Sequence, residues 1–295
     1  MLSTKQKSNY LSTAFGSTFN ITITYILLGD GMKNIIKGFF LLLLVCFSFF
    51  YTDKVINMIN RNDPLMKEII NVKDDYEVLP INGILDDDTI IPGINGRKVD
   101  VDKSYEKMKL GGVFREEALV FKDLFPSSGL KDNGDKYIIK GNGYKKNIAI
   151  IVILNNNYID KIKKLDDITI FINHGDLNVN NINLLKEKEI YTYGNNGIYT
   201  SEILTSDNAL INTISNNKSN YCMLKDKDSE VLKLCSNNGM YVIIPNIIGG
   251  YYDVKNKLSN GSIILLDNLN DIDVIIKYIK GKGYNIVSLS QLLAE

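Results

Sequence analysis

The feature that most constrains this chain is the regular alternation of short apolar runs and amphipathic runs from Asn147 to Glu295. The apolar runs have the length and β-branched composition of strands, expected at 148–154, 168–173, 190–193, 221–224, 241–244, 262–266 and 285–288. The runs between them predict helices at 158–165, 179–187, 200–216, 227–238, 270–280 and 289–294, while 247–259 is assigned to neither. Short apolar strands separated by helices predict an α/β fold with a covered parallel sheet, and seven such units favour a (β/α) barrel over an open sheet.

A second feature is the uncharged run from Gly38 to Thr52, which follows Lys33 and Lys37. A basic flank before an apolar run is typical of a secretory signal or a signal anchor. Because no A-x-A-like cleavage site follows, residues 32–52 are predicted to stay as a single-pass transmembrane helix; the alternative is a buried core helix. The positive-inside rule then places the protein in the cell membrane with its C-terminal domain extracytoplasmic.

The remaining segments complete a predicted domain order. Residues 1–31 are polar and without periodicity, and are interpreted as a mis-called leader. Residues 53–75 are expected to form a helical or loosely ordered stalk. Residues 76–146 carry several turn signals and predict a small α+β pre-domain, with a helix at 102–110, a helix or strand at 117–125 and a strand at 135–140. Residues 147–295 form the main domain.

Composition excludes several classes of function. Lys+Arg and Asp+Glu balance at 34 each, so the chain lacks the overall basic charge of nucleic-acid binding proteins. His174 is the only histidine, which excludes a multi-histidine metal site. Cys222 and Cys235 form no Cys-x-x-Cys pair, so a zinc ribbon is not expected, and two free buried thiols are favoured over a disulfide.

Sites in parallel α/β folds gather at the carboxyl ends of the strands. In this chain those ends are rich in amides and poor in titratable groups. An amide can hydrogen-bond a sugar hydroxyl but cannot act as a general base. The rim therefore predicts binding of a neutral ligand rather than hydrolysis, with candidate binding residues Asn155, Asn156, Asn195, Asn246, Tyr251 and Asp267.

The C-terminal part of the chain resembles a known family. The strand Asn260–Asp267 (NGSIILLD) and the tail 281–293 (GKGYNIVSLSQLL) resemble the close of a polysaccharide deacetylase (NodB-homology) domain, with its G-S-I-I-L-L-H-D strand and K-G-Y-x-x-V-x-L-x-x-L-L tail. The resemblance covers about residues 145–295. It implies a distorted (β/α) barrel that removes acetyl groups from amino sugars. A divalent metal, zinc or similar, would be held by one Asp and two His, with a second Asp as base.

Carried over by position, the family's catalytic motifs are missing. T-F-D-D falls on 153–156, so Asn155 replaces the base and Asn156 the metal-binding Asp. H-x-x-x-H falls on 193–197, so Tyr193 and Gly197 replace the two histidines, and the late histidine falls on Asp267. Neutral side chains do not compensate a divalent cation for its lost water. The resemblance therefore implies a degenerate member without the family metal and without catalytic residues.

The sequence leads to one preferred function and two alternatives. The preferred prediction is a membrane-anchored, extracytoplasmic, catalytically inactive deacetylase-like protein that binds or scaffolds cell-envelope glycan. The first alternative is an active carbohydrate deacetylase with a site rebuilt around Asp267 and His174, with Asp226 or Asp228 nearby. The second is a structural envelope protein whose pre-domain at 76–146 binds a protein partner.

Overall fold

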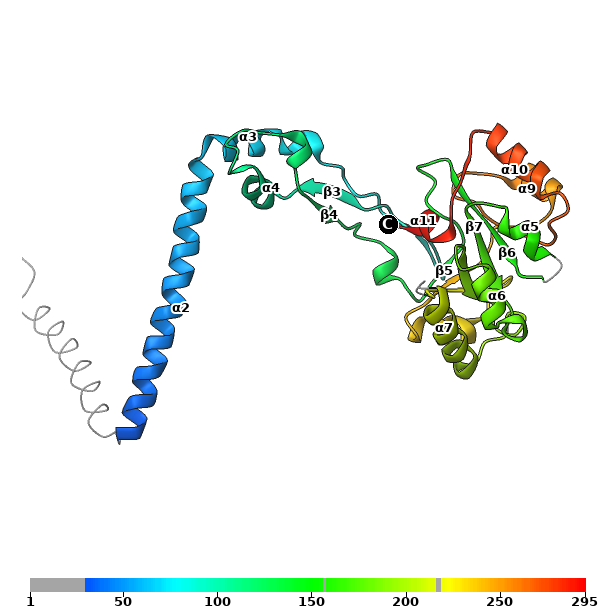
Figure 1. Ribbon diagram of the computed structural model, residues 1–295, viewed down its shortest axis with the longest axis horizontal. Coiled ribbons are helices and arrows are strands. Elements are labelled where there is room, and N and C mark those ends of the chain that lie inside the picture. The colour runs from blue at the N-terminus through cyan, green and yellow to red at the C-terminus, as the bar shows by residue number, and fades with distance from the viewer. Residues whose placement is uncertain (1–29, 156–157, 216–218) are drawn as a thin grey trace, which may run out of the picture. The chain divides into compact units, whose positions relative to one another are not determined.

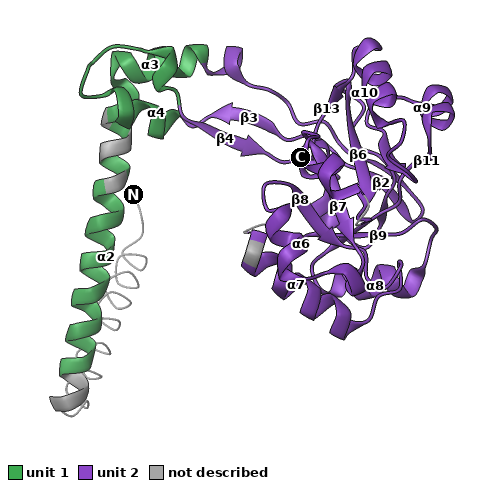
Figure 2. Ribbon diagram, turned by 45° about the vertical axis from the view of Figure 1, so that its right-hand side comes forward, with its two compact units in different colours: residues 1–72, 101–119 green, residues 73–100, 120–295 purple. Residues whose placement is uncertain are grey.

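The computed structural model describes residues 30–155, 158–215 and 219–295 (Figure 1). The chain divides into two compact units, one of residues 1–72 with 101–119 and one of residues 73–100 with 120–295 (Figure 2). Most of the predicted leader, residues 1–29, lies outside the described residues. Residues 76–100 and 120–146, assigned from the sequence to a separate pre-domain, belong to the same unit as 147–295.

The first unit is helical. It contains α2 (Asp30–Asn62), α3 (Pro64–Val72), α4 (Val101–Met108) and the 3-10 turn η2 (Glu116–Ala118). Within α2, the segment Asn34–Thr52 has 19 residues, a mean hydropathy of 2.1 and no buried residues, so it is long and apolar enough to cross a membrane. Asp63 caps α3 by accepting from the Leu65 backbone N–H at 2.8 Å. It also accepts from the Tyr105 hydroxyl of α4 at 2.9 Å, which ties the two short helices together.

The second unit contains two larger sheets and a two-stranded ribbon. The six-stranded sheet has the order β11-β12-β6-β7-β8, with β13 also paired to β6. The five-stranded sheet has the order β1-β2-β5-β10-β9, and β3 pairs with β4. The strands are β1 (Ile84–Asp86), β2 (Thr89–Ile91), β3 (Gly96–Val99), β4 (Phe121–Leu124), β5 (Tyr137–Ile138), β6 (Asn147–Ile153), β7 (Ile168–Ile172), β8 (Glu189–Thr192), β9 (Tyr221–Met223), β10 (Tyr241–Ile243), β11 (Ile247–Gly249), β12 (Ile263–Leu266) and β13 (Asn285–Ile286).

Helices follow most of these strands, as the sequence predicted. They are α5 (Ile159–Lys163), α6 (Val179–Leu184), α7 (Ser201–Ser215), α8 (Ser229–Asn237), α9 (Tyr251–Lys257), α10 (Ile272–Gly281) and α11 (Leu289–Leu293), with 3-10 turns η1 (Lys73–Tyr76), η3 (Leu130–Asp132) and η5 (His174–Asp176). Side-chain caps set several starts: Asn178 accepts from Asn181 N–H at α6, and Asp228 accepts from two backbone N–H groups at α8. Strand β11 and helix α9 occupy the stretch 247–259 that the sequence left unassigned.

The strands are apolar throughout because both of their faces are buried. In β6, Ile148 and Ile150 belong to a cluster that includes residues of α5, α6, α7, α9 and α10. Ala149 and Ile151 face a second cluster, which also takes residues from β9 and β10 of the other sheet. That second cluster is therefore an interior shared by the two sheets. One strand contributes to both clusters because successive side chains point to opposite faces of the sheet.

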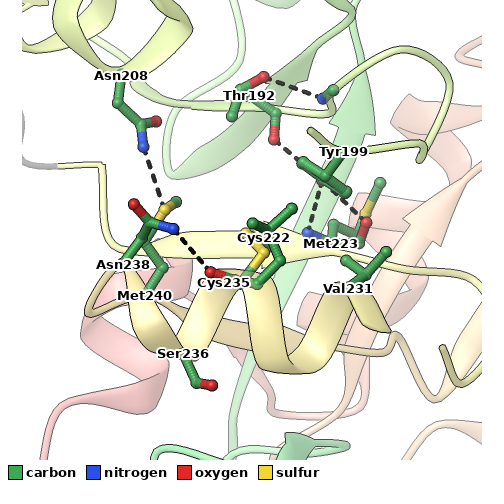
Figure 3. The surroundings of a disulfide bond; sticks show 12 residues. Thr192, Tyr199, Asn208, Cys222, Met223, Val231, Cys235, Ser236, Asn238 and Met240 are labelled. Atoms are coloured by element: carbon green, nitrogen blue, oxygen red, sulfur yellow. Dashed lines mark hydrogen bonds between the residues drawn. A yellow bond between two sulfur atoms is a disulfide. The ribbon is translucent and has the colours of Figure 1, made fainter. Parts of the chain in front are cut away.

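The two sheets meet at two junctions of different kinds. At one, the chain runs from β10 directly into β11, and the Asn246 side chain accepts from Ile263 N–H of β12 at 2.7 Å. At the other, β8 and β9 are neighbours but do not pair in the described residues. There the buried Tyr199 hydroxyl lies between them, 3.3 Å from Thr192 O and 3.1 Å from both N and O of Met223 (Figure 3). The α/β class is confirmed, whereas a closed barrel is not, because no strand pairing joins the two sheets at either junction in the described residues.

The prediction of free thiols at Cys222 and Cys235 is wrong. The two residues form a disulfide, with a Cα–Cα distance of 6.5 Å (Figure 3). Cys222 lies on β9 and Cys235 on α8, and both are fully buried in the cluster that packs this helix on the sheet. Spacing in the sequence could not show that the two side chains face each other, because this depends on how α8 packs. Cys46, on α2, is free and exposed.

We expect the disulfide to stabilise the second unit. The free energy of unfolding of the double variant Cys222→Ser/Cys235→Ser should be about 3 kcal/mol lower than that of the natural protein. This is the value expected for closing a loop of this size in the unfolded chain. Urea denaturation of the full chain, with and without reductant, measures this. Reductant should lower the stability of the natural protein and leave the double variant unchanged. Cys46→Ser is the matched control, and an equal loss in that variant would contradict the assignment.

We also expect the Tyr199 hydroxyl to hold the β8–β9 seam. Tyr199→Phe leaves the Thr192 carbonyl and the Met223 backbone groups without this partner in a buried place, which should cost about 1–3 kcal/mol. The free energy of unfolding from urea titration is the measurement. Tyr144→Phe removes a hydroxyl from a ring that is 74% exposed and serves as the control. Equal stability of the two variants would show that the seam does not need the hydroxyl.

Candidate functional site

A pocket of about 520 Å³ opens at the carboxyl ends of the adjacent strands β12, β6 and β7. This is where ligands bind in parallel α/β folds. Its lining residues come from the ends of these strands and the segments that follow them: Val152, Ile153, Leu154, Asn155, Tyr158, Asn173, Asp176, Leu266, Asp267 and Leu269. The structure therefore brings together Asn155 and Asp267, two of the predicted binding residues, although 112 positions separate them in the sequence.

The polar groups of the pocket are held by their local structure. Asp267 is exposed directly after β12, and Asp176 is half-buried on η5 after β7. The backbone carbonyl of Asp176 accepts from the side-chain amides of Asn178 at 3.2 Å and Asn181 at 2.7 Å, which fixes this turn to the start of α6. The Asn173 amide oxygen accepts from Asn196 N–H at 3.0 Å, which orients its NH₂ group as the remaining donor.

Sequence reasoning did not select Tyr158, Asn173 or Asp176 as site residues. The signal was present for the last two, because Asn173 ends an expected strand and Asp176 follows it closely in the run 173–176. Tyr158 lies in the turn after β6, where its backbone N–H donates to Asn155 O at 2.9 Å. Its place in the pocket follows from the path of that turn, which no local pattern predicts.

The other predicted positions lie elsewhere. Asn156 lies outside the described residues. Tyr193 is 6% exposed and belongs to the interior cluster shared by the sheets. Gly197 has a left-handed backbone with φ of 86°, which disfavours any residue with a Cβ. Asn195 is exposed and forms a single bridge with Ile198.

Two further binding candidates are engaged in structural contacts. The Asn246 side chain bonds the start of β12, as described above, and also reaches Ser262 Oγ at 3.4 Å. Tyr251 packs edge-on against Tyr252 at 5.8 Å and Tyr278 at 5.6 Å, between the ring centroids. Neither Asn246 nor Tyr251 lines the pocket at β12, β6 and β7.

The sole histidine is paired with a carboxylate that the sequence did not single out. His174 Nδ1 lies 2.7 Å from Asp207 Oδ1, and the other oxygen of this buried carboxylate accepts from Thr192 Oγ1 at 2.6 Å. Asp228 is used as the cap of α8. Of the residues in the predicted rebuilt site, Asp267 lines the pocket, whereas His174, Asp226 and Asp228 do not.

The donor set limits the chemistry that this region can carry out. Among the described residues, no three His, Cys, Asp or Glu side chains come together in a way that could hold a metal ion. The pocket offers two carboxylates, two amides and a phenol. These groups can accept and donate hydrogen bonds to a polar ligand, and they lack the imidazole and grouped carboxylates of a metal-dependent hydrolase.

Buried tyrosines in the core of the second unit are kept neutral. Burial raises the pKa of the Tyr191, Tyr199 and Tyr221 phenols above the ordinary value, and for Tyr191 the nearby Glu189 carboxylate adds to the effect. Burial likewise raises the pKa of Tyr193. The folded protein thus holds these protons more tightly than the unfolded chain does.

These raised pKa values make the folded protein less stable at alkaline pH. A raised folded pKa contributes stability that is complete below the unfolded pKa of about 10 and is lost as the pH rises through the folded values. We expect the free energy of unfolding, measured by urea titration at increasing pH, to fall above about pH 10. Tyr221→Phe should make this fall shallower. The exposed Tyr144→Phe should not change it. A fall equally steep in both variants would contradict the assignment.

Known proteins resemble this chain in sequence and in fold. No family model matches the chain. The uncharacterized protein YlxY of Bacillus subtilis (strain 168) is 27% identical over 271 residues, which cover 79% of this chain and 84% of that protein.

Two solved structures of the protein BA3943 are similar in fold. The natural form, described as a CE4 family pseudoenzyme from Bacillus anthracis, has a TM-score of 0.58 and 23% identity, and covers 78% of this chain and 95% of that one. A mutant of the same protein, described as a pseudoenzyme with restored enzymatic activity, has the same TM-score and identity and covers 78% and 98%. The predicted resemblance to the polysaccharide deacetylase fold is confirmed, and the chain has the fold of a CE4 family pseudoenzyme.

Proposed function

We propose that this protein is a catalytically inactive, deacetylase-like protein of the cell envelope that binds glycan through the pocket at β12, β6 and β7. The observation that carries the proposal is the composition of this pocket. It lies where the carboxyl ends of parallel strands meet, and Asn155 and Asp267 line it together. By the resemblance, these two positions correspond to the family's catalytic base and to a late histidine. A pocket that lies at these positions and has an amide in place of the base supports binding without turnover.

Three local features support the loss of catalysis. The position of one family histidine is held by Tyr193, whose phenol is buried and stays neutral because burial raises its pKa. The position of the other is Gly197, whose backbone conformation disfavours a histidine. Asn155 replaces the base with an amide, which cannot take a proton from water.

Two independent observations support the proposed location. The apolar segment Asn34–Thr52 supports a single-pass anchor, with its Lys33 and Lys37 flank on the cytoplasmic side. The Cys222–Cys235 disulfide supports an oxidising compartment for the second unit, because such bonds are rare in the cytosol. Together they support a C-terminal unit outside the cytoplasm.

The two sheets also support a distorted barrel. Strands β12, β6, β7 and β8 pair in one sheet, and β9 and β10 pair in the other. The continuous chain from β10 to β11 joins them on one side, and Tyr199 spans the β8–β9 seam on the other. We propose that this arrangement is the barrel of the deacetylase fold. Between β8 and β9, hydrogen bonds of the Tyr199 side chain take the place of direct strand pairing.

The experiment measures binding and turnover on the same sample. The full chain in detergent micelles should sediment with insoluble peptidoglycan and should release no acetate from it, with or without added zinc. Asn155→Ala/Asn173→Ala should raise the dissociation constant for peptidoglycan at least tenfold, because two direct hydrogen bonds of about 1 kcal/mol each are lost.

Asn237→Ala, an exposed amide at the end of α8, is the matched control and should bind normally. Zinc-dependent release of acetate would overturn the inactive assignment. If that release disappeared in His174→Ala, it would favour the active alternative, now built on the His174–Asp207 pair.

A further inference from the structure

The charge of the pocket is one-sided. Asp267 follows β12 and Asp176 follows β7, so the two carboxylates flank Asn155, which follows the central strand β6. No Lys, Arg or His lines the pocket among the described residues. Residues 156 and 157, which follow Asn155 in the sequence and lie outside the described residues, are both asparagine and carry no charge.

Neither carboxylate is neutralised by the described part of the protein. Asp176 and Asp267 form no ion pair and no side-chain hydrogen bond with any described residue. Lys161, on α5, bonds the backbone carbonyl of Asn270 at 3.3 Å and does not line the pocket. The pocket is therefore an acidic site with unused acceptors, which favours a ligand that carries positive charge.

The apolar lining residues offer little to an acetyl group. Val152, Leu154, Leu266 and Leu269 are each at most 4% exposed, because their side chains belong to the core beneath the pocket. Ile153 is half-buried and packs against the second cluster. An acetyl methyl would find little apolar surface there, whereas hydroxyl groups would meet the amides of Asn155 and Asn173. The Tyr158 ring, half-buried in the same wall, provides a face for a sugar ring.

We propose that the pocket recognises a 2-amino sugar with a free ammonium group, the deacetylated unit of an envelope glycan, in preference to the N-acetylated sugar. The inference rests on the proposed glycan-binding function and names the ligand of that site. The ammonium donates charge-assisted hydrogen bonds to Asp176 and Asp267, which are about twice as strong as neutral ones. An acetamido group carries no charge and offers a single neutral N–H donor, next to a carbonyl acceptor that these carboxylates repel.

The test compares two oligosaccharides on one protein. The full chain in detergent micelles is titrated calorimetrically, at mildly acidic pH, with a glucosamine tetramer and with its fully N-acetylated counterpart. We expect the amine form to bind at least tenfold more tightly. Asp176→Asn/Asp267→Asn, which keeps shape and removes charge, should abolish this preference while the acetylated form binds as before. Asp273→Asn, an exposed carboxylate on α10, is the control and should keep it.

The outcomes separate this inference from the function on which it rests. If the acetylated tetramer binds equally well or better, glycan binding stands and the amine preference is overturned. If neither tetramer binds, both are overturned. Titration with zinc or calcium alone gives the remaining outcome: a cation that binds through the two aspartates, with no binding of the amine tetramer, would identify a metal site and overturn the inference. Circular dichroism of each variant confirms that it is folded.

Discussion

The arrangement of the second unit depends on the burial of β6 on both of its faces. Ile148, Ile150 and Val152 pack toward the surrounding helices, and Ala149 and Ile151 pack into the interior shared by the two sheets. A one-residue slip would exchange the two sets and spoil both cores, so the register with β7 and β12 is strongly determined. That register is also what places the residues after β12, β6 and β7 around one pocket.

The seam between β8 and β9 shows how this fold satisfies buried backbone groups without a continuous ladder. A buried carbonyl or N–H without a partner costs about 1–3 kcal/mol. The hydroxyl of Tyr199 meets this need for groups on both strands, and the nearby Tyr191–Tyr221 contact, with ring centroids 5.1 Å apart, fills the interior side. The Cys222–Cys235 bond then fixes β9 to α8 on the outer face, so the same strand is held from both sides.

Much of the fold could be predicted because its signals are local. The helix starts at Asp228 and Ser288 and the apolar strands 148–154 and 262–266 appear in the structure within a few residues of their expected positions. The pocket was predicted in part: Asn155 and Asp267 line it, whereas Asn246 and Tyr251 do not. Asn246 has the same side chain as Asn155 and also follows an expected strand, but its amide oxygen accepts from the first residue of β12. That contact depends on how the strands pack, which local sequence does not contain.

The sequence by itself determined the α/β class, the apolar segment at 34–52 and the absence of a multi-histidine site, because each follows from periodicity, composition or a count of residues. Only the tertiary structure decided that Cys222 meets Cys235, that His174 pairs with Asp207 and that two aspartates share one pocket. The reason is physical: each of these depends on the direction of side chains from elements far apart in the chain, and that direction is set by packing.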